Sequence, residues 1–169
     1  ADDAEVIVGT DMNQADSDGD GINDGDELLA GSDPRSAPIA IGAVITAEIN
    51  TADEINRYTF MARGGQTVFV DTGGFTILPS TRLRITDSRD EEIYVGTLST
   101  DPGLLVLERG GEYQVTIGDG TSQLSPYRLQ IWDVPAPDEF QIMVGDTVTV
   151  SVPSAGAGQI ETPGVRDIY

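Results

Sequence analysis

The stretch that dictates the local fold near the N-terminus is Asp16–Glu27, which reads DSDGDGINDGDE. Gly21 stands at position 6, where a twelve-residue Ca²⁺ loop turns sharply. The ligand positions 1, 3, 5, 7, 9 and 12 are occupied by Asp16, Asp18, Asp20, the carbonyl of Ile22, Asp24 and Glu27. Ca²⁺ takes about 6–8 oxygen ligands at roughly 2.3–2.6 Å, which alternate residues of a tightly curled loop supply. The stretch therefore predicts a Ca²⁺ site; the alternative is an acidic, glycine-rich disordered linker.

The surroundings of the loop resemble the thrombospondin type 3 repeats and related bacterial calcium repeats. Residues 9–27 read GTDMNQADSDGDGINDGDE, against the family pattern GTDPxxxDxDGDGxxDxxE. Asn23 stands where paired EF-hands have an apolar residue, so we expect the loop to work alone or in a linear array. A similar toxin loop holds two Ca²⁺ ions, and this resemblance implies a candidate second site formed from Asp11, Asn13, Asp26 or Asp33.

The acidic segment contains an internal repeat. Glu5–Asp11 (EVIVGTD) matches Glu27–Asp33 (ELLAGSD) at a spacing of 22 residues, unless the match is a coincidence within a short acidic segment. Pro34–Pro38 replaces the next acidic loop, so the calcium array is expected to end there. We therefore expect residues 1–36 to form a calcium-binding repeat segment.

Charge and composition exclude several classes of function. The chain has 29 acidic and 9 basic residues, so nothing is available to neutralise nucleic acid or an anionic membrane surface. It contains no Cys and no His, which removes thiolate nucleophiles, imidazole bases and the usual zinc ligands. The apolar runs are shorter than the ~20 residues that span a bilayer. We expect a protein that is not an enzyme and works outside the cell or at its surface, where calcium is abundant.

From residue 39 the apolar residues alternate with polar ones, which is the pattern of strands with one buried face. Glycine-rich turns separate eight such stretches. They are residues 44–49, 57–61, 67–71, 82–85, 92–95, 103–107, 113–117 and 127–131. We therefore predict an antiparallel β-sandwich over residues 37–133, preceded by one short helix at residues 24–30.

The sandwich region resembles the bacterial pre-peptidase C-terminal domain over about residues 40–132. The resemblance is carried by Asn56–Phe60 (the D-x-Y-x-F strand), Ala62–Val68 (A-x-x-G-Q-x-V), Leu83–Asp87 and Arg109–Val115 (G-x-Y-x-V). Asn56 departs from the family's usual Asp. The family has no established catalytic residues, so the resemblance implies a noncatalytic module or an accessory domain of a secreted hydrolase or peptidase.

A proline-punctuated stretch opens the last segment, residues 134–169. Val144–Val150 echoes Ile41–Ala47, and Asp167–Tyr169 echoes Asn56–Tyr58, which predicts the truncated start of a second sandwich repeat. We interpret the chain as a slice of a longer protein. Two strands alone are marginal, so we expect residues 138–169 either to pack on the first sandwich or to add a strand to another copy.

Two functions are compatible with these features. The first is a calcium-stabilised structural or adhesive module in a stalk or fibre, with neighbouring repeats or copies as partners. The alternative is a carbohydrate-binding module that uses exposed aromatic side chains. The alternation predicts that Tyr58, Phe60, Tyr113 and Tyr127 belong to the core, which leaves Phe69, Tyr94 and Trp132 to form a glycan-binding patch or to pack on the linker or a neighbouring module.

Overall fold

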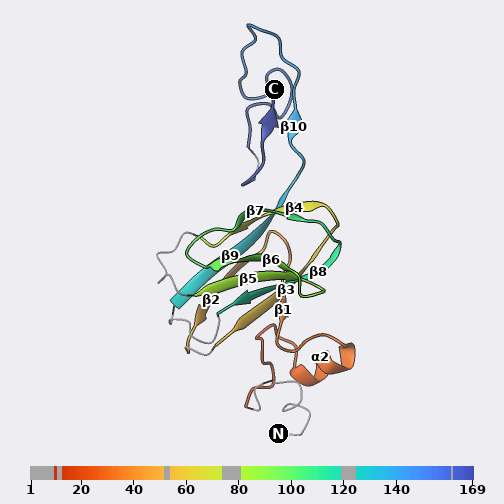
Figure 1. The fold of residues 1–169 in the computed structure, drawn as a ribbon, viewed down its shortest axis with the longest axis vertical. Coiled ribbons are helices and arrows are strands. Elements are labelled where there is room, and N and C mark those ends of the chain that lie inside the picture. The colour runs from red at the N-terminus through yellow and green to blue at the C-terminus, as the bar shows by residue number, and fades with distance from the viewer. Residues whose placement is uncertain (1–9, 11–12, 52–53, 74–80, 119–124, 161) are drawn as a thin grey trace.

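The computed structural model describes residues 10, 13–51, 54–73, 81–118, 125–160 and 162–169. The chain is mainly β and contains one short helix in this part, α2 (Asp24–Ala30), on the N-terminal side of the sandwich (Figure 1). Two sheets form the sandwich, and a slender C-terminal segment projects from the end opposite α2. No helix in the described ranges has the length and apolarity that crossing a bilayer requires.

The two sheets of the sandwich are built almost entirely from antiparallel pairs. The first has the order β1 (Ala37–Pro38), β3 (Asn56–Ala62), β8 (Gly111–Ile117), β5 (Arg82–Asp87) and β6 (Glu92–Thr97). The second has the order β2 (Val44–Ile49), β9 (Ser125–Val134), β4 (Gln66–Asp71) and β7 (Gly103–Leu107). Within them, β1 alone runs parallel to its neighbour, with Ala37 opposite Tyr58.

The core lies between the inner faces of these sheets. In β8 the inward residues Tyr113, Val115 and Ile117 are at most 1% exposed, whereas the residues between them are not buried. Burying such a side chain contributes roughly 1.5–3 kcal/mol. Phe60 stacks on Tyr113 with ring centroids 5.5 Å apart, and the Tyr113 hydroxyl donates to the carbonyl of Arg109 at 2.8 Å. Period-two alternation therefore produces one continuous apolar layer.

The predicted sandwich is confirmed, and each of the eight predicted strands corresponds to one of β2 to β9. The helix predicted at residues 24–30 is α2. The sequence analysis missed β1, because two residues are too few to show a period. β9 extends to Val134, so the linker starts one residue later than expected.

The C-terminal segment folds mostly on itself. β10 (Asp138–Glu139) pairs in parallel with β11 (Asp167–Ile168), and Phe140 stacks on Tyr169 at 5.5 Å. Residues 144–150 form no strand, so the expected repetition of the sandwich opening is wrong at that position. We expected this segment either to pack on the sandwich or to add a strand to another copy. The structure shows packing on the sandwich, and the contact is local. It occurs at Gly164, where a Cβ atom would lie 2.6 Å from Leu104 and 3.4 Å from Phe69.

Candidate metal centre

The loop before α2 is shaped by its own carboxylates. Asp16 accepts hydrogen bonds from the backbone N–H groups of Gly19 (2.8 Å) and Gly21 (2.9 Å). Asp18 accepts from Asp20 N–H at 3.1 Å, and Asp20 accepts from Ile22 N–H at 2.8 Å. Gly21 adopts φ 96°, a conformation that favours glycine. These bonds curl the chain, and the spacing of the aspartates then directs them towards one centre.

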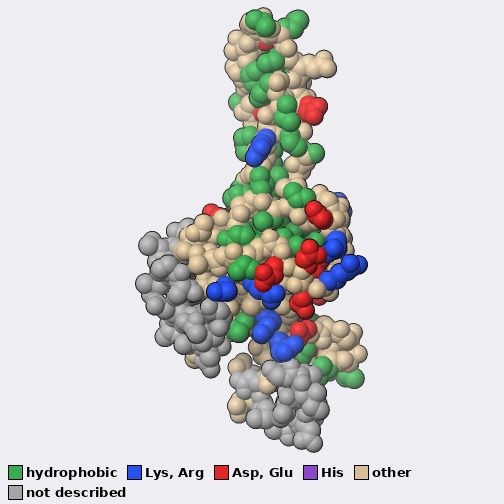
Figure 2. Space-filling view, viewed as in Figure 1, with side chains coloured by type: hydrophobic (Ala, Val, Ile, Leu, Met, Phe, Trp, Pro, Cys, Tyr) green, Lys and Arg blue, Asp and Glu red, His purple; other side chains and the backbone are tan. Residues whose placement is uncertain are grey.

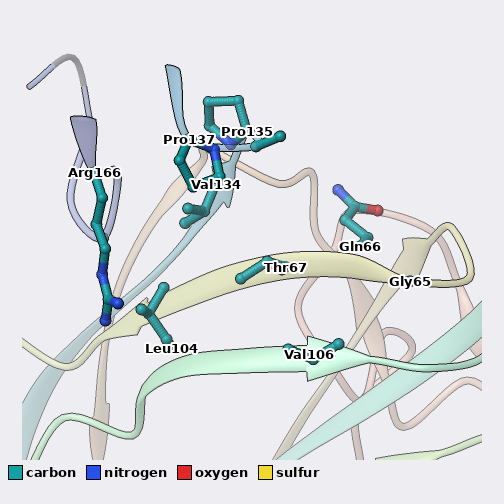
Figure 3. Close-up of a pocket in the computed structure, with 11 residues that line it drawn as sticks. Gly65, Gln66, Thr67, Leu104, Val106, Val134, Pro135, Pro137 and Arg166 are labelled. Atoms are coloured by element: carbon teal, nitrogen blue, oxygen red, sulfur yellow. The ribbon is translucent and has the colours of Figure 1, made fainter. Parts of the chain in front are cut away.

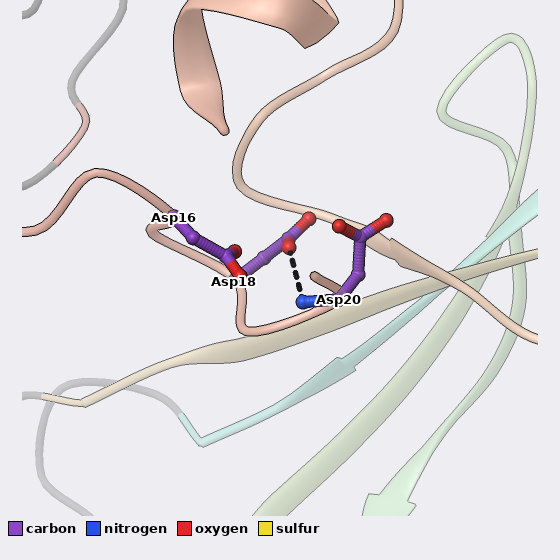
Figure 4. Close-up of side chains that lie close together, drawn as sticks. All are labelled: Asp16, Asp18 and Asp20. Atoms are coloured by element: carbon purple, nitrogen blue, oxygen red, sulfur yellow. Dashed lines mark hydrogen bonds between the residues drawn. The ribbon is translucent and has the colours of Figure 1, made fainter. Parts of the chain in front are cut away.

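The loop brings three of the predicted ligands together. Asp16, Asp18 and Asp20 each offer a carboxylate oxygen, and these oxygens lie within 4.8 Å of one another (Figure 4). In the described part of the chain this is the one group of three or more acidic residues with such geometry. The cluster could hold a metal ion, and its all-oxygen donor set suits a hard cation.

Two carboxylate oxygens near this cluster are buried without compensation. Oδ2 of Asp18 and Oε2 of Glu27 are shielded from solvent and have no hydrogen-bond partner among the described residues. Glu27 as a whole is 2% exposed, although it is ionisable. Its other oxygen, Oε1, accepts a weak hydrogen bond from Ser32 Oγ at 3.3 Å. A buried carboxylate oxygen without a partner raises the free energy of the folded state, and a cation bound at these two atoms would lower it.

The electrostatics of the site point the same way. Burial raises the pKa of Glu27, and the charges of Asp18 and Asp20 raise it further. Burial also raises the pKa of Asp18; the backbone of Asp20 opposes this, whereas the charges of Asp20 and Asp16 add to it. Glu27 therefore lies close enough to the aspartate cluster to sense it. A cation bound between them would stabilise the ionised forms of both groups.

Two other predicted ligands have different surroundings. Asp24 is 5% exposed, and its two oxygens accept from the backbone N–H and the hydroxyl of Ser17, each at 2.7 Å. Its own backbone N–H donates to the carbonyl of Ala15 at 2.8 Å, which closes the loop. Asp24 therefore holds the loop together. The side chain of Ile22 is 48% exposed and carries no oxygen, so only its backbone carbonyl can serve as a ligand.

Three of the four residues expected for a second ion, Asn13, Asp26 and Asp33, belong to the described part of the chain. Asp33 is held by Arg35, whose Nε and Nη2 donate to its two oxygens at 3.0 and 3.2 Å. Burial acts to raise the pKa of Asp33, but the hydrogen bond and charge of Arg35 outweigh it, and the pKa is lowered. Asn13 and Asp26 are exposed, and Asp11 lies outside the described residues.

The loop is joined directly to the sandwich. Ser36 is 5% exposed, and its backbone amide is among the groups that act on the Asp18 carboxylate. The next residue, Ala37, opens β1, and Ile39 N–H donates to the carbonyl of Thr59 at 2.8 Å.

A cleft between loop and sandwich is lined by Asp18 together with Arg35 and Arg57. Burial and the neighbouring charge of Arg35 lower the pKa of Arg57. The acidic loop therefore faces one arginine of its own repeat, Arg35, and one of the sandwich, Arg57.

Asn56, at the position where the sandwich motif that the sequence resembles has Asp, makes a defined contact. Its side-chain Nδ2 donates to the hydroxyl of Tyr127 at 2.9 Å, and this hydroxyl bonds that of Tyr58 at 2.6 Å. Burial raises the pKa of Tyr127, and the charge of Tyr58 adds to this rise. A carboxylate at position 56 could not donate this bond. The sequence showed that Asn stands at this position instead of Asp, but it did not show that Tyr127 accepts its hydrogen bond.

The aromatic side chains fall partly as the sequence predicted. Phe60, Tyr113 and Tyr127 are core residues, and Tyr58 packs against the core. Phe69 and Trp132 are opposite each other on the outer face of the second sheet and are partly buried. Tyr94 lies in the other sheet and packs against the core, so the three residues do not share a patch. Gly164 of the C-terminal segment lies against Phe69.

Comparisons with known proteins bear on both parts of the chain. No curated protein matches the chain in sequence. Among solved structures, it is similar to Aeromonas hydrophila PliG, a periplasmic inhibitor of g-type lysozyme, with 17% identity and a TM-score of 0.47 over 57% of this chain and 94% of that chain. It is also similar to the pre-peptidase C-terminal domain of Bacillus anthracis collagenase, with 14% identity and a TM-score of 0.42 over 57% of this chain and 93% of that one.

The collagenase domain is a member of the family that the motifs of residues 40–132 resemble. The first resemblance is confirmed at the sequence level, because the model of the family described as "Bacterial TSP3 repeat" matches residues 16–37. This match covers the loop, α2 and the first residue of β1. Residues 16–37 of this chain are therefore similar to the bacterial TSP3 repeat.

Proposed function

We propose that the repeat binds one Ca²⁺ ion and that this ion stiffens the junction between the repeat and a noncatalytic β-sandwich. The ligands are the carboxylates of Asp16, Asp18, Asp20 and Glu27 with the carbonyl of Ile22. Asp24 is a positioning residue that acts through Ser17. The observation that carries the proposal is the pair of buried, unpaired oxygens of Asp18 and Glu27. When bound, Ca²⁺ supplies a positive charge next to these two negatively charged oxygens.

We restrict the proposal to one ion. The Asp33 carboxylate is already neutralised by Arg35, and a second cation would have to compete with that ion pair. Asn13 and Asp26 are exposed, so water solvates their side chains when no metal is bound. A second ion would therefore gain less from these residues than the first gains from Asp18 and Glu27.

The structural role follows from the position of the ligands along the chain. Glu27 belongs to α2, Asp18 lies near Ser36, and Ser36 leads directly into β1. An ion that ties Asp18 to Glu27 therefore links loop, helix and sheet. A protein with such junctions behaves as a stiff segment, which suits a secreted or cell-surface protein exposed to abundant calcium.

Calcium titration with a matched pair of variants tests the site. Isothermal calorimetry should detect one Ca²⁺ ion per chain. Glu27→Gln should weaken binding at least about tenfold, because a buried ligand is lost, whereas Asp26→Asn removes the same charge from an exposed neighbour and should change affinity by less than about threefold. Equal effects of the two substitutions would show that only the general negative charge of the loop matters.

The stiffening is tested separately from binding. Small-angle scattering and backbone ¹⁵N relaxation of the full chain, with calcium and with chelator, should show residues 16–36 tumbling with the sandwich only when calcium is present. A loop that binds Ca²⁺ while remaining mobile relative to β1 would leave the metal site standing but remove the mechanical role.

A further inference from the structure

The edge strand β7 has backbone groups that no described strand pairs with, and this inference goes beyond the calcium function. Gly65 N–H donates to the carbonyl of Leu107 at 2.8 Å, so Leu107 faces β4. Backbone groups alternate in direction along a strand, so Leu105 also faces β4, and Leu104 and Val106 face outwards. β7 is the last strand of its sheet, and no other described strand pairs with it. Two residues therefore present their N–H and C=O groups at an open edge.

The side chains of β7 do nothing to protect this edge. The strand reads GLLVL, without charge or proline. Leu104 is 39% exposed and Val106 is 60% exposed. Proteins usually guard edge strands with charges or proline.

The three other edges of the sandwich are guarded in this way. β1 contains Pro38, β2 contains Glu48, and β6 begins at Glu92, which pairs with Arg84 at 3.0 Å. Among the sandwich edges in the described ranges, β7 is thus the exception.

An apolar groove adjoins the same strand. Its volume is about 410 Å³, and it lies between the outer side chains of β7 and the proline-rich linker (Figure 3). Arg166 reaches down from the C-terminal segment to Leu104 at one end of the groove. Hydrophobic side chains continue from this part of the sandwich along the C-terminal segment (Figure 2). The surface beside β7 therefore combines apolar area with a positive charge.

We propose that β7 pairs antiparallel with β7 of a second copy of this chain, about a two-fold axis through Leu105. In this register Leu104 of one copy lies opposite Val106 of the other. Both residues have outward backbone groups, so two hydrogen-bonded pairs form and the second sheets of the two copies join into one. A register shifted by one residue would set a residue with outward groups against one that faces β4, and a shift by two would leave one hydrogen-bonded pair among the Leu104 and Val106 residues instead of two.

The arrangement also avoids a clash between the C-terminal segments. β7 and β9 are both antiparallel to β4, so they run in the same direction, towards the linker. A two-fold axis reverses β7 in the second copy. The two C-terminal segments therefore leave from opposite ends of the joined sheet.

Charge complementarity favours a second copy as the occupant. Glu108 follows β7, is exposed, and has the same phase as Leu104 and Val106 along the chain. In the proposed register, the partner's Glu108 lies diagonally across from Leu104, next to Arg166. Diagonal neighbours on one face are within reach of long side chains. The two-fold axis forms this ion pair twice, which offsets part of the repulsion between two acidic chains.

The association is measured with the full calcium-loaded chain by analytical ultracentrifugation over a range of concentrations. The wild-type chain should form a dimer as concentration rises. Val106→Pro should abolish the dimer, because it removes an outward N–H that β4 does not use, and Val106→Lys should do the same by placing a charge at the edge. Met61→Lys, at an apolar site 67% exposed on β3, is the matched control and should leave the dimer unchanged.

Charge reversal tests the register. Arg166→Glu and Glu108→Arg should each weaken dimerisation about tenfold, and the double variant should restore it. Circular dichroism and thermal melting establish that each variant is folded.

Three results would overturn the proposal: a monomer at all concentrations, a dimer that survives Val106→Pro, or a double reversal that fails to rescue. A monomeric chain whose β7 amide resonances shift with an added peptide of residues 102–108 would show an edge that takes strands from other proteins. None of these results affects the calcium site.

Discussion

The TSP3 repeat and the sandwich differ in what holds their backbone in place. In the sandwich, neighbouring strands share ladders of hydrogen bonds around a core in which residues such as Val68 and Leu83 are fully buried. In residues 16–22 several backbone N–H groups donate to aspartate carboxylates, and the buried residues that follow include Asp24 and Glu27. The first arrangement buries apolar side chains, whereas the second gathers carboxylates whose negative charges repel one another. Stability of the two regions should therefore respond to different perturbations.

The largest effect is expected from a cavity in the sandwich core. Phe60→Ala should lower the free energy of unfolding by about 3–5 kcal/mol, because Phe60 is 2% exposed and stacks on Tyr113. Urea denaturation followed by circular dichroism measures the change. Met61→Ala is the control, since the neighbouring side chain is 67% exposed and should change stability by less than about 1 kcal/mol. Comparable losses for both would show that the core is not where the structure places it.

Removal of calcium should affect the other region. At a concentration a hundredfold above its dissociation constant, Ca²⁺ should stabilise the folded repeat by about 2.7 kcal/mol. Hydrogen exchange with chelator should therefore speed up at amides in residues 16–36, while amides in β8 stay protected. Loss of protection across the whole sandwich would mean that the two regions unfold as one unit.

A smaller effect is expected at the contact between the two sheets near the repeat. Asn56→Asp removes the donor to Tyr127 and sets a negative charge beside two buried hydroxyl groups, so it should destabilise the sandwich by about 1–3 kcal/mol at neutral pH. Thermal unfolding between pH 3 and 7 measures the change. The loss should shrink at acidic pH, where the new carboxyl is neutral and can donate, and a pH-independent loss would contradict this explanation.

The smallest effect concerns the pH dependence of calcium stabilisation. Because the pKa of Glu27 is raised by burial and by Asp18 and Asp20, protons should compete with Ca²⁺ at a pH above the ordinary glutamate range of about 4.3. Without calcium, the folded state holds this proton more tightly than the unfolded state. Stability should therefore be gained as pH falls and lost as pH rises through the raised pKa. The difference between the Tm values with and without calcium should therefore shrink as the pH falls. The shrinkage should be smaller in Glu27→Gln, which has no carboxylate at this position to titrate.

Much of the fold and part of the site could be predicted because their signals are local. Alternation in Tyr113–Ile117 places strand β8 and its buried face, and the same reasoning located the other long strands. The oxygen donors of Asp16, Asp18 and Asp20 gather because residues two apart in a curled loop point the same way. Asp24 shows the limit of this reasoning. Position 9 predicts a ligand, but spacing does not show that both oxygens of Asp24 accept hydrogen bonds from Ser17.

The amino-acid sequence by itself determined the acidic repeat, the strands and the class of the sandwich, because spacing and alternation act over a few residues. Tertiary structure decided what depends on neighbours distant along the chain. Phe69 and Trp132 became cross-strand partners, Tyr94 joined the opposite sheet, and β1 took a parallel place beside β3. β7 acquired an open edge because the order of strands in the second sheet placed it last. A strand's own residues encode its buried face, but the sheet around it decides whether its backbone is paired.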